Sequence, residues 1–168
     1  MSSVLKVDTI QTTAGAVPTT KDLGLAAGSV LQVVRGIGAS GSATSSSSSF
    51  VDEGIQATIT PKFNNSLILV QAMTGDSNSG GYSYYRVTNI TDGHNVCSVP
   101  CGNFSASPQE LKGVTLFGMY LVNSTAARTF RVEGRSNTSS TRYQRYESNA
   151  DDGVTSGKGI IILSEIAQ

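Results

Sequence analysis

Residues 56–73 have the sequence QATITPKFNNSLILVQAM, in which two β-type runs flank a polar turn. Around its start, apolar and polar residues alternate over 55–59, which is the period of a strand with one buried face. After the turn, 67–70 is a continuous apolar run, too short for an isolated helix and typical of a strand buried on both faces. Pro61 and the Asn-Asn-Ser sequence at 64–66 supply turn chemistry between the two runs. The stretch therefore predicts a hairpin-like pair of strands at the centre of an all-β domain.

Further β-type runs occur on both sides of this stretch, separated by segments rich in Gly, Ser and Asn. The run at 111–123 has apolar residues on both faces, and its two glycines favour a strand over a helix. An Asp-Gly pair within 89–95 is a hairpin signal. We expect 36–49 to be a low-complexity loop and 96–108 to be irregular. The segment 137–157 is polar, and its Arg-Tyr pairs at 142–143 and 145–146 are compatible with a strand edge or a contact surface. The clearest strands are expected at 29–35, 55–60, 67–70, 82–87, 111–123, 129–135 and 159–167. A total of about eight or nine strands without a helix predicts an antiparallel β-sandwich or jelly roll.

The composition is neutral and rich in hydroxyl groups. Among 168 residues, twelve are basic and twelve are acidic, and charged residues make up only 14%. This balance gives no electrostatic reason to expect nucleic acid as a partner. No run approaches the roughly 18 apolar residues of a membrane-spanning helix. We therefore expect neither nucleic acid nor a membrane among the partners.

The residue types that bind metals are few and scattered. Cys97 and Cys101 lie close in sequence and could form a small disulfide loop or remain two separate thiols. A zinc site would lack ligands, because the chain has only these two cysteines and one His. That residue, His94, falls in an expected turn with no nucleophile near it in sequence. Asp151 and Asp152 precede a glycine and are compatible with calcium, but such triplets are usually ordinary turns. We expect no metal and no cofactor.

The acidic residues also bear on catalysis. Glycoside hydrolysis requires two carboxyl groups at a set separation. The acids of this chain lie mostly in expected turns or on strand faces. We therefore predict that the protein is not an enzyme.

The first 28 residues contain apolar side chains but no face on which they could pack together. Glycines and a proline interrupt the segment, so it cannot bury enough surface to fold alone. Solvated tails usually lack such apolar residues, which favours an extended arm that orders against a partner over a disordered tail. The residues expected to dock are Val4, Leu5, Val7, Ile10 and Leu23. We divide the chain into an arm, 1–28, and a β-sandwich domain, 29–168.

The order of these pieces resembles the fibre and appendage proteins of marine tailed bacteriophages. The opening SVLKVDTIQTTAG and the following PTTKDLGLAAGSVLQVV resemble the N-terminal arm of that family. The domain resembles the family's C-terminal domain in GSVLQVV at 28–34, a Ser/Thr-rich 40–49, ITP at 59–61, an apolar strand at 67–70 and a final strand at 160–167. The resemblance implies a trimeric, tumour-necrosis-factor-like jelly roll in the virion. The chain has no long coiled-coil or collagen-like shaft, so a short fibre or a capsid knob fits better than a long fibre.

Two candidate surfaces follow from this resemblance. A strand that is apolar on both faces needs cover from the second sheet and from a neighbouring subunit, unless it lies at the centre of a monomeric sandwich. The candidate trimer seam is Leu116, Phe117 and Tyr120. Tyrosine rings stack on sugar faces and their hydroxyl groups form hydrogen bonds, although ordinary strand packing explains each of them more simply. The candidate host contacts are Tyr82, Tyr84, Tyr85, Tyr143 and Tyr146.

Three functional hypotheses result. The first is a short tail fibre or appendage, in which the arm docks onto other phage structural proteins and the sandwich reaches a host-surface glycan or protein. The second, in the same class, is a capsid decoration or head fibre protein that stabilises the shell. The third is a lectin-like module that acts off the virion.

Overall fold

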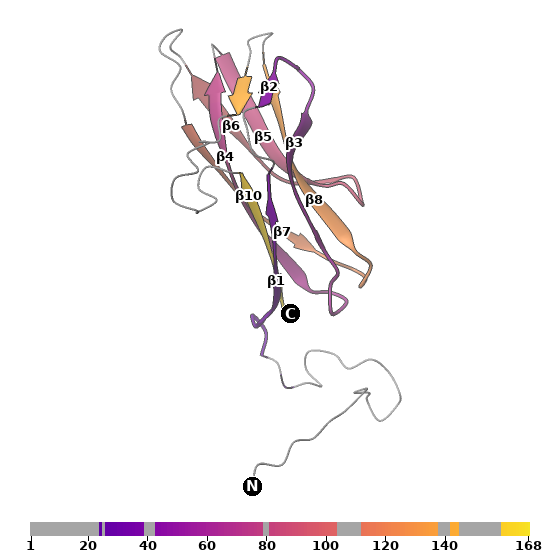
Figure 1. The fold of residues 1–168 in the computed structure, drawn as a ribbon. Helices are drawn as coiled ribbons and strands as arrows, with labels where there is room; N and C mark the ends of the chain where they lie inside the picture. The colour runs from indigo at the N-terminus through magenta and orange to yellow at the C-terminus, as the bar shows by residue number, and fades with distance from the viewer. Residues whose placement is uncertain are drawn as a thin grey trace.

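The computed structural model is an antiparallel β-sandwich (Figure 1). It describes residue 24 and residues 26–38, 43–78, 81–103, 112–137, 142–144 and 159–168. Within these ranges there are ten strands and no helix, so none that is long and apolar enough to cross a membrane. The strands are β1 (Val30–Ile37), β2 (Ala43–Ser45), β3 (Val51–Ile59), β4 (Leu67–Asn78), β5 (Gly81–Asn89), β6 (His94–Asn103), β7 (Lys112–Leu121), β8 (Arg128–Ser136), β9 (Arg142–Gln144) and β10 (Ile160–Ile166). The predicted all-β sandwich is confirmed. The short β2 lies in a segment that we expected to be irregular, whereas β9 falls where a strand edge is one of the two alternatives that the sequence leaves open.

The strands form two sheets that enclose the core. The first sheet has the order β1-β10-β4, with β7 on the other edge of β4 and the short β9 and β2 beside the far end of β4. The second sheet has the order β3-β8-β5-β6. Every pairing is antiparallel. Most pairs of adjacent strands in a sheet are distant in sequence, because the chain passes repeatedly from one sheet to the other.

Alternating side chains from the two sheets fill the core. On β3, Ile55 and Ile59 are fully buried and the residues between them alternate, as the sequence predicts. Phe130 and Val132 of β8 are buried beside them, which confirms the inward face expected for that strand. Ile68 of β4 belongs to the same cluster. The alternation of strand residues therefore determines which face of each sheet is internal.

The stretch at 56–73 does not form the hairpin that its sequence predicts. β3 pairs with β8 in the second sheet, whereas β4 pairs with β10 and β7 in the first. Residues 60–66 thus cross between the sheets, and their number exceeds the two to five residues of a usual hairpin loop. The two apolar runs lie in opposite sheets and contribute to the same core instead of pairing edge to edge. The expected turn chemistry is present, since Asn65 adopts a left-handed conformation with φ of 64°.

A buried carboxylate holds this crossover in place. Glu165 of β10 is fully buried and accepts hydrogen bonds from the backbone N–H groups of Lys62 at 2.8 Å and Phe63 at 3.3 Å. Gln32 of β1 donates its side-chain amide to the same carboxylate at 2.6 Å. Burial of a charge is tolerated when donors surround it in this way. Glu165 therefore links β1, β10 and the crossover.

The β5–β6 pair forms the hairpin expected from the Asp-Gly signal. β5 ends at Asn89, β6 begins at His94, and Gly93 between them has φ of 72°. In contrast, the expectation of irregular structure from residue 96 onward is wrong, because β6 continues to Asn103. β6 is an edge strand of its sheet, where Pro100 is tolerated although it lacks an N–H group.

The two ends of the domain lie side by side (Figure 1). The N–H of Gly28 donates to the carbonyl of Ala167 at 2.8 Å, and the N–H of Ala167 donates to the carbonyl of Ser29 at 2.9 Å. The chain therefore enters β1 at the end of the sandwich where β10 leaves it.

Candidate functional site: an apolar sheet face

The outer face of the first sheet is apolar across four adjacent strands. The register aligns four rows of side chains across β1, β10, β4 and β7. These side chains point outward, and their neighbours along each strand are buried or less exposed. The apolar members, which we call the apolar face, are Val30, Val33, Ile37, Leu67, Leu69, Met73, Phe117, Met119, Leu121, Ile160, Ile162 and Ile166. The remaining positions of the rows are Arg35, Gln71, Thr115 and Ser164. Only Arg35 among these sixteen positions carries a charge.

The apolar face is open to solvent in the single chain. Its six most exposed side chains have exposed fractions of 56–60% and are Val30, Val33, Met73, Phe117, Met119 and Leu121. Scattered exposed hydrophobic residues are normal on a protein surface, but a contiguous apolar patch over four strands marks an interaction site. This face is therefore the candidate interaction surface of the domain.

The structure corrects the set of residues predicted for the trimer seam. Phe117 lies on the apolar face and is 57% exposed. Leu116 is fully buried in the core, and Tyr120 lies on the same inward side of β7 and packs edge-on against Phe130 at 5.7 Å between ring centroids. Successive strand residues point to opposite faces, so the three could not share one surface. The sequence signal for the outward set is that Phe117, Met119 and Leu121 occupy every second position of the run and so share one face of the strand.

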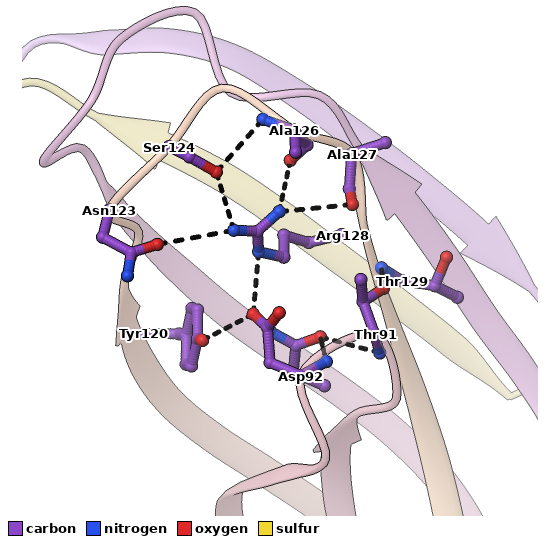
Figure 2. Close-up of polar contacts among 10 residues, drawn as sticks. Thr91, Asp92, Tyr120, Asn123, Ser124, Ala126, Ala127, Arg128 and Thr129 are labelled. Atoms are coloured by element: carbon purple, nitrogen blue, oxygen red, sulfur yellow. Dashed lines mark hydrogen bonds and ion pairs between the residues drawn. The ribbon is translucent and has the colours of Figure 1, made fainter.

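Tyr120 belongs instead to a polar cluster at one end of the sandwich (Figure 2). The guanidinium Nε of Arg128 lies 2.7 Å from a carboxylate oxygen of Asp92, and the Tyr120 hydroxyl donates to the same oxygen at 2.7 Å. Arg128 also donates to the carbonyl of Ala126 and to the hydroxyl of Ser124, both at 2.8 Å. The cluster joins the β5–β6 turn to the β7–β8 loop.

The electrostatics of this cluster are those of a structural clamp. The hydrogen bond from Tyr120 lowers the pKa of Asp92, with Asn89 and Arg128 acting in the same direction against a smaller effect of burial. Burial and the neighbouring Asp92 carboxylate raise the pKa of Tyr120. Asp92 is thus ionised and Tyr120 protonated near neutral pH, which keeps the hydrogen bond and the ion pair intact.

The outer face of the second sheet is charged instead of apolar. The Glu133 carboxylate accepts hydrogen bonds from Arg86 at 2.7 Å, Arg131 at 2.5 Å and Thr88 at 2.9 Å. Burial opposes the ionisation of Glu133, but the hydrogen bonds from Arg131 and Arg86 outweigh it and lower its pKa. Glu133 is thus the common hydrogen-bond acceptor of this charged face.

The five tyrosines proposed as host contacts fall in different places. Tyr85 is fully buried and donates to Asp76 at 2.6 Å, so it cannot contact a host molecule, because its ring points into the core from β5. Tyr82 and Tyr84 are on the outward side of the same strand, opposite in direction to Tyr85. Tyr143 is in β9, and Tyr146 lies outside the described residues, as do Val4, Leu5, Val7, Ile10 and Leu23, the residues expected to dock.

The two cysteines do not bond to each other. Cys97 and Cys101 lie four residues apart on the regular part of β6. A strand rises about 3.3 Å per residue, which puts their Cα atoms about 13 Å apart and beyond the roughly 7 Å limit of a disulfide. Burial raises the pKa of the Cys97 thiol. In the part of the chain that the structure describes, no three His, Cys, Asp or Glu residues group as a metal site would require, and Asp151 and Asp152 lie outside that part.

Comparison with known proteins supports the fold alone. No family model matches the chain. No curated protein matches it either. Among solved structures, the Eiger TNF from S. frugiperda superimposes with a TM-score of 0.52 over 81% of this chain and 92% of that chain, at 13% sequence identity. At this identity the likeness shows that the chain has a TNF-like jelly-roll sandwich.

Proposed function

We propose that the protein is a homotrimeric structural component of a tailed-phage virion, without enzymatic activity. In this proposal it is a short tail fibre or appendage that docks through residues 1–28 and projects the sandwich toward the host. The apolar face is the observation that carries the self-association, and the resemblance of the arm and domain sequences to phage fibre proteins supports the trimer and the virion.

The apolar face supplies a driving force of the right size for association. Fully burying a Val, Leu, Phe or Met side chain contributes about 1.5–3 kcal/mol. Burying the remaining exposed part of its six most exposed side chains would therefore contribute roughly 5–10 kcal/mol per chain. That gain is of the same order as the cost of lost translational and rotational freedom on association, about 4–15 kcal/mol. Burying the partly exposed isoleucines and leucines of the same rows would add to the favourable free energy of association.

Docking through the arm can be tested in assembled particles. We expect the full chain with Leu5→Asp and Ile10→Asp to be absent from purified particles, because charge at these positions opposes burial against another virion protein. A control chain with Thr9→Asp and Thr12→Asp places the same charge at polar positions of the same segment and should be incorporated. Incorporation of both variants at the wild-type level would refute docking through the apolar residues of the arm.

The position on the particle separates this proposal from its alternatives. Gold-labelled antibody should mark the tail or its base if the protein is a fibre or appendage. Label spread over the head would favour a capsid decoration or head fibre protein. Particles without label would favour a lectin-like module acting off the virion.

A further inference from the structure

The outer face of the second sheet contains one arginine whose charge is not neutralised by a neighbouring carboxylate in the described structure. Arg135 of β8 pairs with Tyr84 of β5 in the register and points outward, because Gly134 and Ser136 on either side of it are buried. This surface belongs to the opposite sheet from the apolar face. It therefore stays open when the apolar face is covered.

The other two arginines of this face are already paired. Arg86 and Arg131 both bind the Glu133 carboxylate, and Arg131 also lies 3.5 Å from Asp52. Among the described residues, no carboxylate lies within ion-pair distance of Arg135, and its one hydrogen bond there is a long contact of 3.5 Å to the carbonyl of Ser48. The guanidinium of Arg135 thus retains N–H donors for a ligand.

Two aromatic rings fix the orientation of this guanidinium. Its central carbon lies 4.4 Å from the ring centroid of Tyr84 and 5.3 Å from that of Phe50. Stacking on a ring uses the flat face of a guanidinium and leaves the N–H edge available for an oxyanion. A side chain already held in place loses less conformational entropy on binding. Arg135 is therefore pre-organised to bind a carboxylate through two parallel hydrogen bonds.

The surroundings of Arg135 suit a sugar ring. Tyr82 lies two residues before Tyr84 on the same side of β5 and is 36% exposed, and Pro100 of β6 is exposed directly opposite Tyr84. Tyrosine presents an apolar ring with a polar tip, which matches the apolar face and hydroxyl rim of a sugar. The surface thus combines one oriented cation with adjacent apolar and hydroxyl groups.

We propose that Arg135, Tyr84 and Tyr82 bind an acidic saccharide, with the sugar carboxylate on the Arg135 guanidinium and the ring against the tyrosines. The inference supplies a ligand class for the host-facing surface in the proposed function. It does not depend on the oligomeric state, because the three residues lie in one chain and outside the apolar face.

Titration calorimetry of the full-length protein with a galacturonic acid tetramer tests the inference. We expect saturable binding that Arg135→Gln weakens about 10- to 100-fold, the range of about 1.5–3 kcal/mol for hydrogen bonds to a charged group. Arg135→Lys should also weaken binding, because a lysine lacks the planar pair of donors. Lys62→Gln removes one positive charge from the exposed crossover and should leave binding unchanged.

Two further ligands define what the site recognises. A neutral galactose tetramer and a glutamate tetramer should each bind at least about 10-fold more weakly than the acidic sugar, because each lacks one of the two features that the site matches. Equal binding of the neutral sugar, equal binding of the peptide, or unchanged binding by a folded Arg135→Gln variant would each overturn the proposal. An unchanged sedimentation profile of the variants would show separately that the proposed oligomer is intact.

Discussion

We expect Glu165→Ala to destabilise the domain through the crossover between the two sheets. Truncation removes the acceptor for the backbone N–H groups of Lys62 and Phe63 and for the amide of Gln32. Each buried donor left without a partner costs about 1–3 kcal/mol. The N–H groups here are only partly buried, which places each at the lower end of the range, so we expect a total loss of about 3 kcal/mol.

Urea unfolding at one fixed protein concentration measures this loss, because the stability of an oligomer depends on concentration. The midpoint should fall with little change in the m-value. Glu165→Gln keeps the shape and one acceptor oxygen, and should lie between the wild type and the alanine variant. Asp52→Ala, which removes an exposed carboxylate on the other sheet, is the matched control and should change stability by less than about 1 kcal/mol. A Glu165→Ala variant within about 0.5 kcal/mol of the wild type would refute the role of the buried carboxylate.

Three further predictions concern other parts of the sandwich. The pKa of the Asp92 carboxyl is lower in the folded protein than its ordinary value of 3.8, so ionised Asp92 stabilises the fold at pH values above 3.8. This stabilisation is lost as the pH falls through the lower folded-state pKa. The melting temperature of the wild type should therefore exceed that of Asp92→Asn at pH 6, and the two melting temperatures should converge toward pH 2. Gly36→Ala should cost at least about 2 kcal/mol because its Cβ would collide with the backbone carbonyl of Gln56, whereas Gly113→Ala meets no atom within 4 Å and should be nearly neutral in thermal unfolding. Mass spectrometry after alkylation in denaturant without reductant should find both Cys97 and Cys101 modified, and a mass two hydrogens lower without alkylation would contradict their separation on β6.

Several strands and one turn were predictable because the patterns that indicate them involve only residues that are close together in the sequence. The alternation at 55–59 and the Asp-Gly turn in 89–95 both have the expected structure. The pairing of β3 with β8 depends on residues far apart in the chain, and a local pattern cannot distinguish two strands that pair edge to edge from two that pack across a core. This is why the central stretch was predicted as a hairpin but is a crossover.

The candidate surface was predictable only in part. The excess of apolar residues at 111–123 indicated that β7 needs cover on both sides, and Phe117, one of the three residues predicted for the trimer seam, lies on the exposed face. The sequence alone did not show that β1, β4 and β10 align their outward residues beside those of β7, because that depends on the register between distant strands. The role of Glu165 was also not predicted. An acidic residue within an otherwise apolar strand does indicate a carboxylate that is buried together with hydrogen-bond donors.

The mass of the protein in solution tests whether the apolar face joins three chains. Sedimentation equilibrium should give three times the 17.5 kDa of one chain. Met119→Glu places a charge in the middle of the apolar face and should give a folded single chain, whereas Gln56→Glu places the same charge on the outer face of the other sheet and should keep the wild-type mass. A wild-type protein that remains a single chain at all concentrations, or a Met119→Glu variant that retains the wild-type mass, would contradict the account.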